Sequence, residues 1–167
     1  YVKEVIIRLQ KDYPNWTLVL LGMDWHNHSG GGLDRSRIEW HGWADIDAYP
    51  FAMKGLCCDI GIAPISKIEF NECRSSIKWL EYSALKMATV ATKFGPYERD
   101  CEDEVTALLV DGKEEWYGAL SKLLEDAEAR KGLGERAYRK AKRIYDLDVM
   151  VDRWMDIFSQ SKKLQAT

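Results

Sequence analysis

A lysine and a glutamate three positions apart stand near the start of an expected helix that begins at about Ser75. Lys78 and Glu81 share one face of that helix, because residues three or four apart are neighbours on a helical surface. The free N–H groups and the positive dipole end of such a helix form an anion site. A cation and a carboxylate just inside that end suit a ligand that carries phosphate next to a polyhydroxylated ring. Nucleotide-sugars have this layout, so the spacing predicts a nucleotide-sugar site.

The composition excludes several classes of partner. Lys and Arg total 24 and Asp and Glu total 27, and a net charge of −3 gives no overall attraction to nucleic acid or to an anionic membrane. No apolar run approaches the ~18 residues of a membrane helix, and no signal peptide is visible. We therefore expect one cytoplasmic domain of 167 residues, without a nucleic-acid partner.

The cysteines do not form a C-x-x-C pair. Cys57 and Cys58 are adjacent at the start of an expected buried strand, and Cys73 and Cys101 stand alone. This pattern favours small core residues in a reducing cytosol over a disulfide framework. In the loop that begins at Asp24, His26 and His28 form at most a weak metal site, and we interpret them as loop residues near the crevice.

Short apolar runs alternate with helical patterns, which predicts an α/β fold with a Rossmann-like parallel sheet sandwiched by helices. The expected strands are 17–21, 38–43, 59–63, 88–92 and 107–110. The expected helices are 2–13, 46–56, 75–87, 113–126, 128–145 and 148–162, so that the chain ends in a helical tail. Asp45 is the expected cap of the second helix, which Pro50 interrupts or breaks.

Ligands of such sheets bind beyond the carboxyl ends of the strands. In this chain those ends are Gly22, Gly42-Trp43, Ala63-Pro64-Ile65 and 92–97. The helix that carries Lys78 and Glu81 follows one of these loops, so its first turn is expected on the ligand side.

Five motifs cover almost the full length of the chain. They are Ile38-Glu39-Trp40-His41-Gly42-Trp43, Cys58-Asp59-Ile60-Gly61-Ile62-Ala63-Pro64, Lys78-Trp79-Leu80-Glu81-Tyr82-Ser83-Ala84-Leu85 before the strand at 88–91, Ala107-Leu108-Leu109-Val110-Asp111-Gly112, and Leu133-Gly134-Glu135-Arg136-Ala137. In this order they resemble the C-terminal, nucleotide-sugar-binding domain of GT-B glycosyltransferases, especially those like family 4.

The resemblance implies roles for individual residues. Glu81 would hold the ribose hydroxyls, and Lys78 would meet the diphosphate. Backbone N–H groups around Ser75, Ser76 and Ile77 would help to bind the diphosphate. The base would be bordered by Gly42, Trp43, Pro64 and Ile65.

The resemblance also implies an activity. It is the transfer of a hexosyl group, with retention, from a nucleoside diphosphate sugar to an acceptor hydroxyl in glycan or polysaccharide biosynthesis, without a metal or other cofactor. Residues 1–167 would form one donor-binding domain. The first strand, the catalytic groups and the N-terminal domain that binds the sugar or glycan acceptor would precede Tyr1. We therefore expect the chain alone to bind the donor weakly and to catalyse no transfer.

One position departs from the family pattern. The first carboxylate of the E-x7-E motif falls on Cys73, while Glu72 is one residue away and Glu69 lies in the same loop. The stretch from Asn71 to Glu81 is closer to a subset with the pattern N-x-x-K-S-x-x-K-x-x-E. In that subset Arg74 takes the place of the first lysine and forms a cationic pair with Lys78.

Other interpretations remain open on the sequence alone. Lys78 and Glu81 could form only an exposed ion pair, and Ser75 or Ser76 could serve only as the helix cap. The whole domain could be a non-catalytic nucleotide-sugar-binding module, or a sugar-nucleotide 2-epimerase of the same fold. A basic cluster in the helix 128–145 is interpreted as a solvated face, with a surface that steers anionic partners or a membrane as the alternative.

Overall fold

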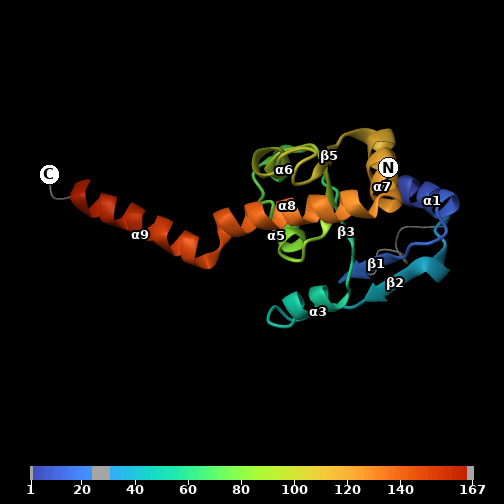
Figure 1. Cartoon of the computed structure of the whole chain (residues 1–167), viewed down its shortest axis with the longest axis horizontal. Coiled ribbons are helices and arrows are strands. Elements are labelled where there is room, and N and C mark those ends of the chain that lie inside the picture. The colour runs from blue at the N-terminus through green and yellow to red at the C-terminus, as the bar shows by residue number, and fades with distance from the viewer. Residues whose placement is uncertain (1, 24–30, 165–167) are drawn as a thin grey trace.

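The computed structural model describes residues 2–23 and 31–164 and shows parallel strands flanked by helices (Figure 1). In chain order the elements are α1 (Val2–Asp12), β1 (Leu18–Leu21), η1 (Arg35–Arg37), β2 (Ile38–His41), α3 (Tyr49–Gly55), β3 (Ile60–Ala63), α4 (Glu69–Glu72), α5 (Ile77–Ala84), β4 (Ala88–Thr92), α6 (Pro96–Asp100), β5 (Leu108–Val110), α7 (Gly112–Glu125), α8 (Ala127–Tyr145) and α9 (Leu147–Leu164). The predicted α/β class, its parallel strands and its helical tail are confirmed.

The strands form two sheets rather than one. β1 pairs with β2, and a separate sheet has the order β3-β4-β5, with every pairing parallel. In Figure 1, β1 and β2 lie apart from β3, toward the side of the molecule where α1 is found. The sequence could not reveal this division, because periodicity identifies strands but does not identify their neighbours.

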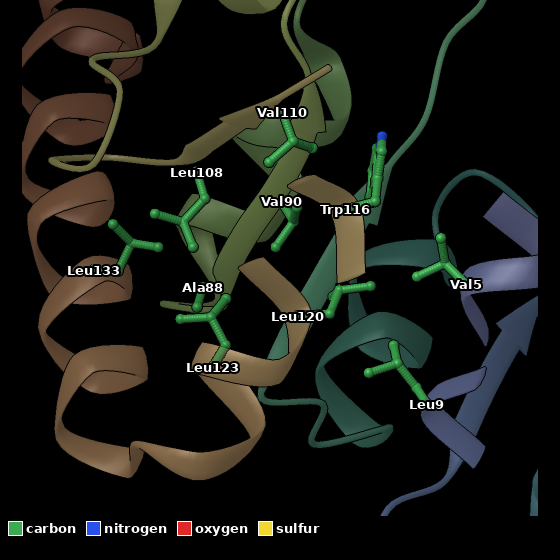
Figure 2. Close-up of a cluster of buried hydrophobic side chains, with 10 residues drawn as sticks. All are labelled: Val5, Leu9, Ala88, Val90, Leu108, Val110, Trp116, Leu120, Leu123 and Leu133. Atoms are coloured by element: carbon green, nitrogen blue, oxygen red, sulfur yellow. The ribbon is translucent and has the colours of Figure 1, made fainter. Parts of the chain in front are cut away.

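The main core lies where α7 and α8 pack on the three-stranded sheet, and α1 extends it by packing against α7 (Figure 2). Val90 and Val110 of the sheet, Leu9 of α1 and Trp116 of α7 are at most 5% exposed. All five residues of β4 are buried, as expected for the central strand of a parallel sheet that is covered on both faces.

The short α-helices α4 and α6 were not predicted, and α3 begins later than expected. α4 lies in the segment between β3 and α5, and α6 follows β4. α3 begins at Tyr49, and Pro50 lies in its first turn, where a missing N–H costs nothing. The prediction that Asp45 caps this helix is wrong. Its backbone carbonyl accepts the N–H groups of Ala48 and Tyr49, which closes a turn before α3.

The interpretation of all four cysteines as core residues is also wrong. All four are free thiols, and Cys57 and Cys73 are exposed. Cys57 has a positive φ of 49° and lies in the turn before β3 rather than in the strand. Cys101 is buried, and desolvation raises the pKa of its thiol to about 12.

The basic cluster of α8 is partly engaged with the body of the protein. Lys140 pairs with Glu102 at 2.8 Å, and the Arg136 guanidinium donates to the carbonyl of Val105 at 2.8 Å. Beyond α8, α9 extends away from the rest of the chain (Figure 1). Within the described residues, no helix has both the length and the apolar character that a membrane crossing requires.

Gly134 allows α8 to approach the turn between α5 and β4. A Cβ at this position would lie 1.9 Å from the backbone carbonyl oxygen of Lys86. We predict that Gly134→Ala lowers the free energy of unfolding by about 1–3 kcal/mol, because the clash is with backbone that cannot rotate away.

Gly118 of α7 provides the control, since a Cβ there meets no atom within 4 Å. Gly118→Ala is expected to stabilise the protein by about 0.5–1 kcal/mol through the higher helix propensity of alanine. Urea denaturation followed by circular dichroism measures both variants. Equal stabilities of the two would contradict the close approach at Gly134.

Candidate functional site

The contact between α5 and β3 sets the position of the site. Gly61 of β3 lies under the Tyr82 ring, and a Cβ at Gly61 would come within 2.3 Å of that ring. The Tyr82 hydroxyl donates to the carbonyl of Ile62 at 3.2 Å. Burial raises the pKa of Tyr82 to about 12, so the phenol stays protonated and donates this hydrogen bond. α5 can therefore lie directly against the strand whose carboxyl end opens onto the site.

Two further hydrogen bonds fix the start of α5. The Ser76 hydroxyl donates to Asp100 Oδ2 at 2.7 Å, and the buried Trp79 indole donates to the carbonyl of Thr106 at 3.1 Å. The Trp79 side chain therefore faces the core. Neither Ser75 nor Ser76 caps α5 with its hydroxyl. Ser76 occupies the cap position, but its side chain makes no capping hydrogen bond.

The carboxyl ends of β3 and β4 are joined at the same edge. The N–H of Ile65, just after β3, donates to the Thr92 hydroxyl at 3.0 Å. Gly95 follows β4 with a φ of 53°, and a Cβ there would lie 3.0 Å from the Cα of Glu72. The segment that precedes α5 is therefore held against the segment that follows β4.

A cavity of about 260 Å³ opens at this edge of the sheet. It is lined by Ile62, Ala63, Pro64, Ile65, Arg74, Ser75, Ile77, Lys78, Tyr82, Pro96 and Tyr97. The fold thus brings together Arg74, Ser75, Ile77, Lys78, Pro64 and Ile65 of the predicted site. Two cations and the first turn of α5 face one small hollow, which is an arrangement suited to an anion.

Glu81 lies next to this cavity through its contact with Lys78. Lys78 Nζ lies 3.0 Å from Glu81 Oε2, which confirms that the two residues share a face. Lys78 Nζ also donates to the hydroxyl of Tyr49 at 2.9 Å, and that hydroxyl donates to Glu81 Oε2 at 3.0 Å. Partial burial disfavours the charge on Lys78, but the hydrogen bonds to Tyr49 and Glu81 outweigh this effect, so the pKa of Lys78 is raised. The lysine therefore keeps its positive charge throughout the neutral range.

The other predicted residues lie outside the cavity lining. Trp43 is 82% exposed, and its ring lies beside Gly22, where a Cβ would be 3.3 Å away. Gly42 precedes it at the end of β2, and a Cβ at Gly42 would meet no atom within 4 Å. Ser76 is not part of the lining, and its hydroxyl contacts Asp100. Most of the residues predicted to bind the diphosphate therefore line one cavity. The residues predicted to border the base are divided, because Pro64 and Ile65 follow β3, whereas Gly42 and Trp43 follow β2 in the other sheet.

The residues around Cys73, which stands where the family pattern has its first carboxylate, are exposed. Cys73, Glu72 and Glu69 all lie at the surface, and Arg74 Nη1 is 3.5 Å from Asn71 Oδ1. His26 and His28 lie outside the described residues. Among residues 2–23 and 31–164, no three His, Cys, Asp or Glu side chains gather as a potential metal site.

Sequence reasoning missed three tyrosines at the site. Tyr97 followed a predicted strand end, so its place in the chain could have suggested it. Tyr82 is next to Glu81 but faces the sheet. The sequence around Tyr49 does not indicate a place at the site, because its contacts with Lys78 and Glu81 span 29 and 32 residues.

A second cavity, of about 440 Å³, lies at the opposite edge of the three-stranded sheet, before β3 and β4. Met53, Cys57, Cys58 and Met87 contribute sulfur atoms to its lining. It contains neither Lys78 nor Glu81, and it lies at the amino ends of parallel strands, where ligands of such sheets do not usually bind.

Comparison with known proteins supports the resemblance seen in the motifs. The family model described as "Glycosyl transferases group 1" matches residues 1–126. No curated protein matches the chain at a significant level. The solved C-terminal domain of a glycosyl transferase group 1 family protein (LpcC) from Francisella tularensis is 25% identical, with a TM-score of 0.68 over 86% of this chain and 77% of that one.

Two longer proteins share the fold at lower identity. HepE of Anabaena, solved in complex with UDP, is 17% identical with a TM-score of 0.70 over 94% of this chain and 44% of that one. Sucrose-phosphate synthase from Thermosynechococcus elongatus is 15% identical with a TM-score of 0.74 over 96% of this chain and 42% of that one. The chain thus spans less than half the length of either protein.

The two serines before α5 offer a matched pair of variants. We predict that Ser76→Ala lowers the free energy of unfolding by about 1–2 kcal/mol, because it leaves the Asp100 carboxylate without its hydroxyl partner. Ser75 is exposed, and Ser75→Ala is expected to change stability by less than about 0.5 kcal/mol. Denaturant titration of both variants distinguishes them. A Ser76→Ala protein as stable as the wild type would show that this bond does not hold the start of α5.

Proposed function

Because the chain belongs to the group 1 glycosyl transferase family, we propose that it binds the nucleoside diphosphate part of a sugar donor in the 260 Å³ cavity. In this proposal the phosphates lie against Arg74, Lys78 and the first N–H groups of α5. Glu81 accepts hydrogen bonds from the ribose hydroxyls.

The observation that carries the proposal is the pairing of Lys78 with Glu81 at the rim of a cavity that also contains Arg74. An α-helix rises about 1.5 Å per residue, so Glu81 lies about 4.5 Å further along the axis than Lys78. A ligand with charge at one end and hydroxyl groups next to it matches this order. That HepE of Anabaena was solved with UDP supports the same assignment.

Such a site would favour sugar transfer through its effect on the leaving group. When the bond between the sugar and the diphosphate breaks, negative charge grows on the diphosphate. Fixed cations and helix N–H groups stabilise that charge without reorganising. Lys78 suits this role, since its raised pKa keeps the ammonium charged.

We further propose that the whole protein transfers a hexosyl group, with retention, to an acceptor hydroxyl in glycan or polysaccharide biosynthesis in the cytoplasm. The donor-binding part is expected to be inactive by itself. Product analysis with the longer protein would distinguish transfer from 2-epimerisation.

A non-catalytic binding module is the second candidate. The observation in its favour is Cys73, which stands in place of a family carboxylate and is exposed. A donor site can retain its phosphate and ribose contacts without this carboxylate. The module would therefore bind the nucleotide as well as an enzyme does, and turnover by the longer protein separates the two candidates.

Isothermal titration with UDP, GDP and ADP tests the binding site. We expect Glu81→Ala to weaken binding of the preferred nucleotide by about tenfold or more, because it removes charge-assisted hydrogen bonds to the ribose. Glu135→Ala is the control, since Glu135 pairs with Lys86 near the second cavity. Failure of the folded wild-type chain to bind any of these nucleotides would refute the proposed function.

Metal independence is a separate prediction. Lys78, Arg74 and the helix N–H groups provide the positive charge at the site, so the dissociation constant of the preferred nucleotide is expected to be the same in EDTA and in Mg²⁺. Titrations in the two buffers measure it. A marked gain in affinity with Mg²⁺ would contradict this prediction, while leaving the binding site in place.

A further inference from the structure

Tyr49 joins the Lys78–Glu81 pair from a different element. It is the first residue of α3, and its side chain contacts two residues of α5. Its hydroxyl accepts from Lys78 Nζ at 2.9 Å and donates to Glu81 Oε2 at 3.0 Å. Lys78 Nζ also lies 5.4 Å from the centre of the Tyr49 ring, within range of a cation–π contact.

The three groups form a closed ring of hydrogen bonds. Lys78 donates to Tyr49 and to Glu81, and Tyr49 donates to Glu81. A tyrosine hydroxyl has one proton, so its direction in this ring is fixed by the lysine, which can only donate. Networks of this kind hold side chains in one geometry before a ligand arrives.

The ring leaves a defined set of groups for a ligand. Each carboxylate oxygen has about two lone-pair positions, and Glu81 Oε2 already accepts from Tyr49 and from Lys78. Within the described part of the chain, Glu81 Oε1 has no hydrogen-bond partner, and Lys78 uses two of its three N–H groups. Hydroxyl groups of a ligand must therefore bind at Oε1, and the third N–H of Lys78 is left for a phosphate.

We propose that Tyr49 is a positioning residue that occupies Glu81 Oε2 and thereby presents Oε1 to the vicinal hydroxyls of the bound ribose. This inference rests on the proposed function, because it assigns Tyr49 to the same nucleotide site. Without the Tyr49 hydroxyl, the carboxylate loses one of the two bonds that fix its orientation. The effect on affinity should then depend on whether the ligand carries the hydroxyls that Glu81 accepts.

A thermodynamic cycle over the protein and the ligand tests this dependence. Tyr49→Phe and the wild type are titrated with UDP, 2′-deoxy-UDP and 3′-deoxy-UDP, or with the corresponding forms of GDP or ADP if one of them binds better. We expect Tyr49→Phe to weaken the ribonucleotide by about three- to tenfold and at least one deoxy form by less than about twofold. This difference is a readout that a merely structural role would not produce.

Tyr117 offers a matched control. Its hydroxyl donates to the Asp12 carboxylate at 2.7 Å, and the Arg8 guanidinium stacks on its ring, so it has the same types of contact far from the cavity. Tyr117→Phe is expected to leave all nucleotide affinities unchanged. Melting temperatures confirm that each variant is folded, and Tyr49→Leu provides a second variant without the hydroxyl.

The outcomes separate this inference from the proposed function. Equal weakening of ribo and deoxy forms by Tyr49→Phe would show a structural role and overturn the inference, as would unchanged affinities. Either result would leave nucleotide binding intact. If the folded wild-type chain bound none of the nucleotides, the proposed function would fail and the role of Tyr49 would fail with it.

Discussion

The close approach of α5 to β3 at Gly61 is the constraint on which the site depends. The Tyr82 ring occupies the space that a Cβ of Gly61 would fill, and this brings the helix down onto the strand. The bonds from Ser76 to Asp100 and from Trp79 to Thr106 then fix its start. Lys78 faces the cavity because these contacts leave the helix little freedom to rotate or slide.

The Lys78–Glu81 pair gains little stability from its own attraction. The two side chains are 46% and 23% exposed, and ion pairs that are partly exposed to water contribute about 0–1 kcal/mol. Tyr49 adds order to the pair rather than much free energy, since it links α3 to α5 through hydrogen bonds to both charged groups. The value of the network lies in holding a cation and an acceptor oxygen in place before a ligand binds.

Features that depend on neighbouring residues in the sequence could be predicted, whereas features that depend on backbone turns or on distant residues could not. The apolar run of β4 and the Lys78–Glu81 spacing depend on neighbours in sequence, and both appear in the structure as expected. The late start of α3 depends on a turn closed by the backbone of Asp45, which side-chain propensity does not report. The division into two sheets depends on which strands pair, and the local sequence does not report this.

The same distinction explains which of the predicted residues line the cavity. Arg74, Ser75 and Lys78 are close in sequence, so the first turn of α5 and the residues just before it bring them together in the cavity lining. Trp43 comes from the β1–β2 sheet, and its position relative to the cavity depends on how two separate sheets are arranged. A base that reached Trp43 would have to extend from the β3–β4–β5 sheet toward β2. In the proposed binding mode, one end of α5 would hold the phosphates, whereas contacts with the base would depend on how the two sheets are arranged.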